Sequence, residues 1–550
     1  MNAMSVFGDY KAYKQFAPQY KDWKYSRDLA EAKRREYIRN NPDAINTKDI
    51  QKSKALLRAI DIMDEFSQKR AEDMEVATES VVSMGTGIAG LIGGALGVGA
   101  LLAKKGVKYF NKQSKDLAVG GPLLVALYVG SGLLSSLAGI PLFSWGAKQE
   151  LEASRRGRFE AMRGDLNSAQ TFALLNDEQE KILNEKLSKT KVKRKTFKEM
   201  INSSKGFDAI RGLSAGKEEY LAQRMMFENK LQEDMLHFDQ ELSDEEIENA
   251  KRDQQLLTNI IEKIDIASQD YAENTELATS AITAIVFGAG ALFGLFYEKI
   301  AQKLKLGNSI GPKIIGGAVM LATMIFSTSI QKEASRVGRF KVKQDLLNHP
   351  EKLVYVSDED ANKITDVEIE KEKKLNIFKF LKEAWKNDKE YKNWKKTDGA
   401  IEKATVKALS EIDITDEQMQ EAKRLQHNTF KTFNKIDENS QKYSESIEAI
   451  GQSVQFPIET LFSTLGALFG IKYFNKAMEL FESGVKGPGA TNNMIKYFAI
   501  IFLSVLPSIG INAYITKEQK KASRAADMMS IKDLEDYRNF ADYSKYKANT

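Results

Sequence analysis

The chain has 550 residues, of which 29% are charged, and its net charge is only +5 at pH 7. Cysteine is absent, which excludes disulfides, thiol catalysis and thiolate metal sites. The three histidines, His237, His349 and His427, lie far apart in the sequence and argue against a histidine metal site. Because no nucleic-acid motif, phosphate loop, nucleophile elbow or metal-ligand spacing occurs, the sequence predicts no enzyme, no cofactor and no nucleic-acid partner.

Six long apolar runs interrupt this otherwise polar chain. They span residues 81–103, 117–147, 278–297, 314–331, 458–471 and 497–515, and they contain one charged residue, Glu459. A helix needs about 20 apolar residues to cross a hydrocarbon core of about 30 Å. We interpret the runs as transmembrane helices, with the fifth extended to residues 458–475. The alternative is that they are buried core helices of a soluble protein.

Short motifs recur around these runs in the same order, with a period of roughly 180 to 190 residues. The pattern Asp-x-x-Ser-Gln begins at Asp64, Asp265 and Asp437, and Ala-Ser-Arg begins at Ala153, Ala334 and Ala522. Gly-Pro recurs at Gly121, Gly311 and Gly487; the second and third copies separate the two apolar runs of their units, and the first lies near the start of the run 117–147. We therefore divide the chain into repeat units 1–185, 186–370 and 371–550. The sequence predicts an all-α integral membrane protein made of three tandem helical hairpins, with six transmembrane helices and cytoplasmic helical extensions.

The distribution of Lys and Arg residues predicts that both termini lie on the same side of the membrane. A cluster of Lys and Arg residues follows the second apolar run of each unit, for example from Lys148 to Arg163. By the positive-inside rule these clusters face the cytoplasm. The prediction is an inner-membrane protein with both termini in the cytoplasm.

Outside the apolar runs, spacings of three and four residues predict helices with one buried stripe. One stripe comprises Leu257, Ile261, Ile264, Ser268 and Tyr271. The stripe aligned with it by the repeat comprises Thr429, Phe433, Ile436, Ser440 and Tyr443. Linkers are expected over residues 176–192 and 348–370, where Pro350 stops a helix. Residues 354–356 have the composition of a short strand.

Glycines at one-turn spacing predict close helix packing within the hairpins. The candidate packing residues are Gly90, Gly94, Gly97, Gly290, Gly294, Gly466 and Gly470. The same small-residue seam continues to Gly157, Gly338 and Ala526. Lining of a pore is the alternative role of these glycines.

Arginines beside this seam are candidates for binding a lipid headgroup or for pairing with aspartates of the incoming helices. The candidate residues are Arg155, Arg158, Arg336, Arg339, Arg524, Asp64, Asp265 and Asp437. The third unit departs from the pattern, because Asp527 stands where the others have Arg158 and Arg339.

Two stretches rich in lysine and aromatic residues, 10–25 and 371–396, fit either an anionic lipid surface or packed helices with solvated lysines. The function predicted from these features is a membrane-embedded scaffold that anchors a helical cytoplasmic assembly. Its expected partners are membrane lipid, proteins bound through the cytoplasmic helices, and a second copy of the chain. An uncharged pore or translocation channel formed by the glycine-rich hairpins is the alternative, favoured if Ser and Thr residues of the spans converge on one axis.

Overall fold

A computed structural model shows a helical protein. It describes residues 3–105, 152–189, 217–236, 243–268, 336–369 and 400–437, with shorter pieces between 134 and 150, at 271, at 389–391 and between 473 and 530. The labelled elements are α1 (Ala3–Asn40), η1 (Pro42–Ala44), α2 (Thr47–Lys105), η2 (Ala169–Phe172), α5 (Asp177–Ser188), α8 (Lys217–Leu236), η3 (Pro350–Leu353), α11 (Asp358–Asn362) and α14 (Ala400–Ser410). Residues 152–163, 244–268, 336–348 and 416–437 are also helical.

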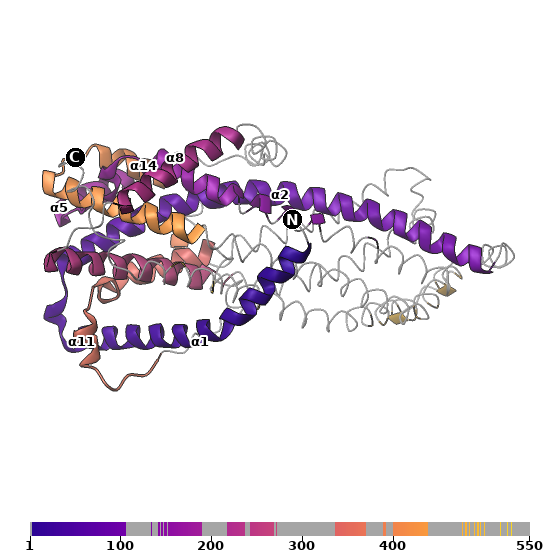
Figure 1. Cartoon of the computed structure of the whole chain (residues 1–550), viewed down its shortest axis with the longest axis horizontal. Coiled ribbons are helices and arrows are strands. Elements are labelled where there is room, and N and C mark those ends of the chain that lie inside the picture. The colour runs from indigo at the N-terminus through magenta and orange to yellow at the C-terminus, as the bar shows by residue number, and fades with distance from the viewer. Residues whose placement is uncertain are drawn as a thin grey trace.

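Helix α2 is the axis of the described structure. It runs along the long dimension of the molecule, with its first half beside α5, α8 and α14 and its second half extending away from them (Figure 1). The 3-10 helices η2 and η3 both lie against α2, and α1 contacts α11 and η3. The first half of α2 is therefore the common support of the helical body.

Several helices begin at capping boxes. In a capping box, the residue before the helix and the residue three positions later each accept a hydrogen bond, through the side chain, from the backbone N–H of the other. Asn176 and Gln179 form such a box at the start of α5, with both bonds at 2.9 Å. Ser243 and Glu246 begin the helix 244–268 in the same way. Thr415 with Gln418 does so for the helix 416–437. These boxes fix the points at which the chain enters the helical body.

One large apolar core joins segments that are remote in sequence. It contains residues of α2, the helices 152–163, 244–268 and 416–437, η2, α5 and α14. The predicted stripe from Leu257 to Tyr271 is buried at all five positions, as are Thr429, Phe433 and Ile436 of the second stripe, whose Ser440 and Tyr443 lie outside the described residues. The periodicity thus identified the core faces of two helices correctly. A smaller cluster, formed by Ile38 of α1 with Val354, Val356 and Ala361, holds α1 to the segment around α11.

The membrane prediction is contradicted. Among the residues that the structure describes, no helix combines the length and the apolarity needed to cross a bilayer. The run 81–103 forms the second half of α2, a helix whose first half is charged, and seven of its residues are glycines, which add little apolar surface. The runs 278–297 and 314–331, and nearly all of 117–147, 458–475 and 497–515, lie outside the described residues. The fold class is corrected to all-α, and the six transmembrane helices and the inner-membrane location are withdrawn.

The three tandem hairpins are withdrawn as well, because no structural repeat is identified among the described residues. A local contact does recur and is described below. Two smaller expectations are also wrong: residues 177–188 of the first expected linker form the capped helix α5, and residues 354–356 are not a strand. The expected stop at Pro350 is confirmed, because the preceding helix ends at residue 348.

Candidate functional site

Two glycines bring pairs of helices into backbone contact. A Cβ atom on Gly157 would overlap the carbonyl oxygen of Phe66 in α2, and one on Gly338 would lie 2.6 Å from the carbonyl oxygen of Ala267. Phe66 and Ala267 each stand two residues after an aspartate of the Asp-x-x-Ser-Gln pattern, Asp64 and Asp265. The predicted seam at Gly157 and Gly338 is therefore a close approach of helices in both places.

This close approach positions two arginines in the same way. The Nε–H of Arg158 donates to Ser67 Oγ at 3.3 Å, and the Nε–H of Arg339 donates to Ser268 Oγ, also at 3.3 Å. Each arginine then reaches an aspartate on a third helix. Arg158 pairs with Asp437, and Arg339 Nη1 lies 3.3 Å from Asp64 Oδ2. Together with the two serine contacts, the two ion pairs connect five helices.

Asp265 differs from Asp64 and Asp437, the two other aspartates of the Asp-x-x-Ser-Gln pattern. Among the described residues it makes no hydrogen bond and no ion pair, although it is half-buried. Burial and the neighbouring Asp64 carboxylate raise the pKa of Asp265 to about 6, against the attraction of Arg339 and Arg158. Burial also raises the pKa of Asp64, despite the same two arginines. Asp265 is therefore a half-buried carboxyl group that forms no ion pair with a cation in the described part of the chain.

A small pocket of about 30 Å³ opens beside these pairs, with room for about two water molecules. Its charged lining comes from α2, the helix 336–348 and α14: Asp61, Asp64, Glu65, Arg336, Arg339, Lys343 and Glu402. We call it the charged pocket. Asp61 is paired with Lys343 across it. With Ile264 of the helix 244–268 also in its wall, the pocket is a junction of four helices, lined by both signs of charge.

Glu402, in the first turn of α14, is the most unusual group of the charged pocket. It is only 5% exposed, and its Oε2 has no hydrogen-bond partner. Burial, with the nearby carboxylates of Asp61 and Glu65, raises the pKa of Glu402 to about 7, although Lys343 opposes the shift. A carboxyl group in this position holds or releases a proton near neutral pH.

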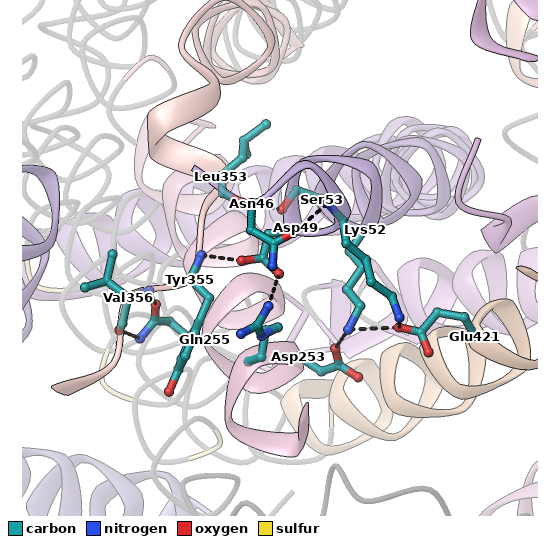
Figure 2. A network of polar contacts seen from close by, with 12 residues as sticks. Asn46, Asp49, Lys52, Ser53, Asp253, Gln255, Leu353, Tyr355, Val356 and Glu421 are labelled. Atoms are coloured by element: carbon teal, nitrogen blue, oxygen red, sulfur yellow. Dashed lines mark hydrogen bonds and ion pairs between the residues drawn. The ribbon is translucent and has the colours of Figure 1, made fainter. Parts of the chain in front are cut away.

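A second polar cluster, centred on Lys52, is by contrast held together by ion pairs between buried charges of opposite sign (Figure 2). The Lys52 side chain is completely buried, and its Nζ lies 2.8 Å from Asp253 and 2.9 Å from Glu421. Arg424 contacts the same two carboxylates at 2.9 and 2.7 Å. The cluster joins α2 to the helices 244–268 and 416–437. Because its buried charges are matched, we assign it to the framework of the molecule.

The same region holds the segment that was expected to be a strand. The side-chain amide of Gln255 donates to the carbonyl oxygen of Val356 and accepts from its N–H, both at 3.1 Å (Figure 2). Asp49 accepts from the N–H of Tyr355 at 3.2 Å and from Arg252 at 3.1 Å. Side chains thus supply the backbone partners that a neighbouring strand would have supplied.

The structure gathers some of the predicted site residues and not others. Arg158, Asp64, Asp265, Asp437, Arg336 and Arg339 lie at or beside the charged pocket. Arg155 lies in the helix 152–163, away from the pocket lining, and Gly90, Gly94 and Gly97 lie in α2. Arg524, Gly290, Gly294, Gly466, Gly470, Ala526 and Asp527 lie outside the described residues.

Sequence reasoning missed Glu402, Asp61 and Lys343. A signal for Glu402 was present, because it shares a helix face with Thr405 and Leu409, three and seven residues later, and all three are buried.

Of the basic aromatic stretches, Tyr391 is buried and its ring centre lies 5.9 Å from that of Phe340, whereas Tyr25 is 62% exposed. Packing therefore explains Tyr391.

Two helices carry large apolar side chains on an outer face. On α2, Ile88, Ile92 and Leu96 are 54%, 51% and 60% exposed, while Val82 and Gly93 on another face are buried. On α8, the outward residues are Leu221, Met225 and Met226, which are 42% to 73% exposed. The inner side of α8 is fixed by Phe227, whose ring centre lies 5.8 Å from that of Phe159. We call these surfaces the α2 face and the α8 face.

Comparison with known proteins adds no family to these observations. No family model, no curated protein and no solved structure matches the chain.

Proposed function

We propose that this protein is a helical scaffold that binds partner proteins on the α2 face and the α8 face. The observation that carries the proposal is the outward exposure of Ile88, Ile92 and Leu96 at one-turn spacing on a helix whose other side is packed. Single exposed apolar residues are common, but rows of large ones mark interaction sites in folded proteins. Such a row presents the spacing with which one helix recognises another.

The α8 face supports the same function with different chemistry. Met225 and Met226 are unbranched and polarisable, so they adapt to partners of different shape. The aromatic contacts of Phe227 with Phe159 and Phe430 hold the helix from behind. An adaptable surface on a fixed helix suits binding, because the helix need not be ordered when the partner arrives.

Buried ion pairs inside the molecule are consistent with a rigid scaffold. The buried pairs of Lys52 with Asp253 and Glu421, and of Arg158 with Asp437, connect segments from all thirds of the chain. Breaking one member of a buried pair leaves the other charge without compensation, which disfavours rearrangement. The faces are therefore held at fixed positions relative to each other.

We propose proteins as the partners, in preference to lipid. Lipid binding was predicted from arginines near the seam, and two of them, Arg158 and Arg339, are engaged with Asp437 and Asp64. The pore alternative depended on the transmembrane helices that have been withdrawn, so we do not carry it further. A second copy of the chain is the simplest partner and is tested first.

The experiment places a photo-crosslinking amino acid at position 92 or 226 of the full chain, and at position 178 of α5 as a control on an exposed polar site. We expect discrete protein adducts from positions 92 and 226 and none from 178. Sedimentation velocity of the purified chain then separates self-association from binding of another protein. With the probe kept at position 92 or 226, Leu96→Asp and Met225→Asp on the same faces should remove the matching adducts without lowering the melting temperature. Equal crosslinking from all three positions would contradict the proposal.

A further inference from the structure

We propose that the charged pocket is a proton-sensitive joint: protonation of Glu402 and Asp265 fastens α14 and the helix 244–268 to α2, and their ionisation loosens both. The inference is independent of the partner-binding function, because it concerns the inside of the helical body.

The first support is the pairing pattern around the pocket. The cations that face it or adjoin it stand opposite carboxylates: Lys343 opposite Asp61, Arg339 opposite Asp64, Arg158 opposite Asp437, and Arg27 of α1 at 2.7 Å from Glu262. Arg336 and Glu65 complete the charged lining. Among the described residues, Glu402 and Asp265 have no such ion pair. When both ionise, they add negative charge that no described cation pairs with.

The second support is where each group sits. Glu402 is buried in the wall of a cavity that holds about two waters, with Asp61 and Glu65 on the opposite helix. Asp265 follows Ile264, which is part of the same wall. Ionised carboxylates in these positions repel the carboxylates of α2 and require hydration. Admission of water at the pocket separates the N-terminal end of α14 from α2.

The third support is that the other end of α14 is anchored independently. Leu409 is part of the main core, and the side-chain amide of Gln170 donates to the carbonyl oxygens of Leu409 and Ile412, both at 2.9 Å. Lys186 of α5 pairs with Glu411 at 2.6 Å. The N-terminal turn of α14 can therefore open while its C-terminal end stays in place.

The direction of the response follows from the two titrations. The pKa of Glu402 is raised from 4.5 to about 7, and that of Asp265 from 3.8 to about 6. Between pH 4.5 and about 7 for Glu402, and between pH 3.8 and about 6 for Asp265, the closed joint binds more protons than the open one. The closed form is therefore favoured at low pH and is lost as pH rises. For release of one proton, the opening equilibrium shifts by up to about tenfold per pH unit. The change should level off above the folded-state pKa of Glu402.

Hydrogen exchange of the full chain tests this joint. Exchange of the α14 amides 403–410, corrected for the intrinsic pH dependence, is measured from pH 5 to pH 8.5. For the wild type we expect protection to fall by at least about tenfold between pH 5 and pH 7 and then to level off. Glu402→Gln should keep low-pH protection throughout, and Asp265→Asn should reduce the change.

The matched control is Glu178→Gln, which removes an exposed carboxylate of α5 outside the charged pocket and should leave the pH profile unchanged. A wild-type profile without pH dependence, or an unchanged profile in Glu402→Gln, would overturn the proposal. If Glu402→Gln does not fold, the wild-type carboxyl carbon of Glu402 is followed by isotope-edited NMR. Titration below pH 5 would then overturn the proposal, and titration near pH 7 would support it.

Discussion

Arg158 and Asp437, which are 279 residues apart in the sequence, form an ion pair that joins the helix 152–163 to the helix 416–437. The Arg158 guanidinium also donates to Ser67 of α2 at 3.3 Å, so one side chain connects three helices. Because both partners are largely removed from water, loss of either leaves a charge that the surroundings do not compensate. Asp437, which has a charged partner, should therefore respond to substitution differently from Asp265.

Asp437→Asn should lower the free energy of unfolding by about 1 to 3 kcal/mol, because Arg158 loses its charged partner. Asp265→Asn should instead be neutral or stabilise by about 1 kcal/mol at pH 7.5, because it removes a carboxylate with which none of the described cations forms an ion pair. Denaturant unfolding at pH 7.5 measures both. Equal destabilisation by the two substitutions would show that Asp265 has a partner after all.

Gly157→Ala and Gly338→Ala should each destabilise the protein by about 1 to 3 kcal/mol, because the new methyl group meets a backbone carbonyl that cannot move aside. The control is Gly489→Ala, whose Cβ would lie 3.6 Å from a Leu480 side-chain atom, an ordinary contact. Melting temperatures of the three variants give the comparison. A control that loses as much stability as the other two would remove the close approach as the cause.

Lys52→Met should lower the free energy of unfolding by about 3 to 5 kcal/mol, since it leaves Asp253 and Glu421 buried without the shared ammonium group. Lys186→Met removes a lysine from the exposed pair with Glu411 and should change the stability by less than about 1 kcal/mol. Circular dichroism during denaturant unfolding distinguishes the two. A small effect at Lys52 would mean that Arg424 alone compensates both acids.

Glu402→Gln should raise thermal stability at pH 8 and leave it nearly unchanged at pH 4.5. The folded protein holds the Glu402 proton up to about pH 7, whereas the unfolded chain releases it near pH 4.5. The wild type therefore loses stability as pH rises between these values, by up to about 3 kcal/mol. Calorimetry of both proteins across this range measures the difference, and parallel curves would contradict the assignment.

The sequence predicted the helical class and two buried stripes, because helical periodicity is a local property that tertiary packing preserved at Leu257, Ile264 and Phe433. It also singled out the arginines and aspartates that meet at the charged pocket. It did not predict which aspartate each arginine contacts, because Arg158 crosses to Asp437 and not to an aspartate of its own unit. Such choices depend on how remote helices are arranged, which motif spacing does not contain.

The membrane interpretation failed for a related reason. Apolar composition shows that a segment avoids water, but it does not show what the segment lies against. In the stretch 81–103, Val82 is buried while Ile88 and Ile92 are about half exposed, within one continuous helix. The raised pKa of Glu402 was equally out of reach, because it depends first on burial by remote helices and then on the carboxylates of Asp61 and Glu65, which lie far away in the sequence.

The buried ammonium group of Lys52 also constrains when the protein is able to fold. On the ribosome, Lys52 emerges long before Asp253, and Glu421 appears later still. At ordinary translation speeds these delays amount to tens of seconds. Until then α2 carries a lysine on its core face with no carboxylate to receive it, so the core cannot close around that turn. The nascent N-terminal part should therefore stay accessible to chaperones and proteases until most of the chain has been made.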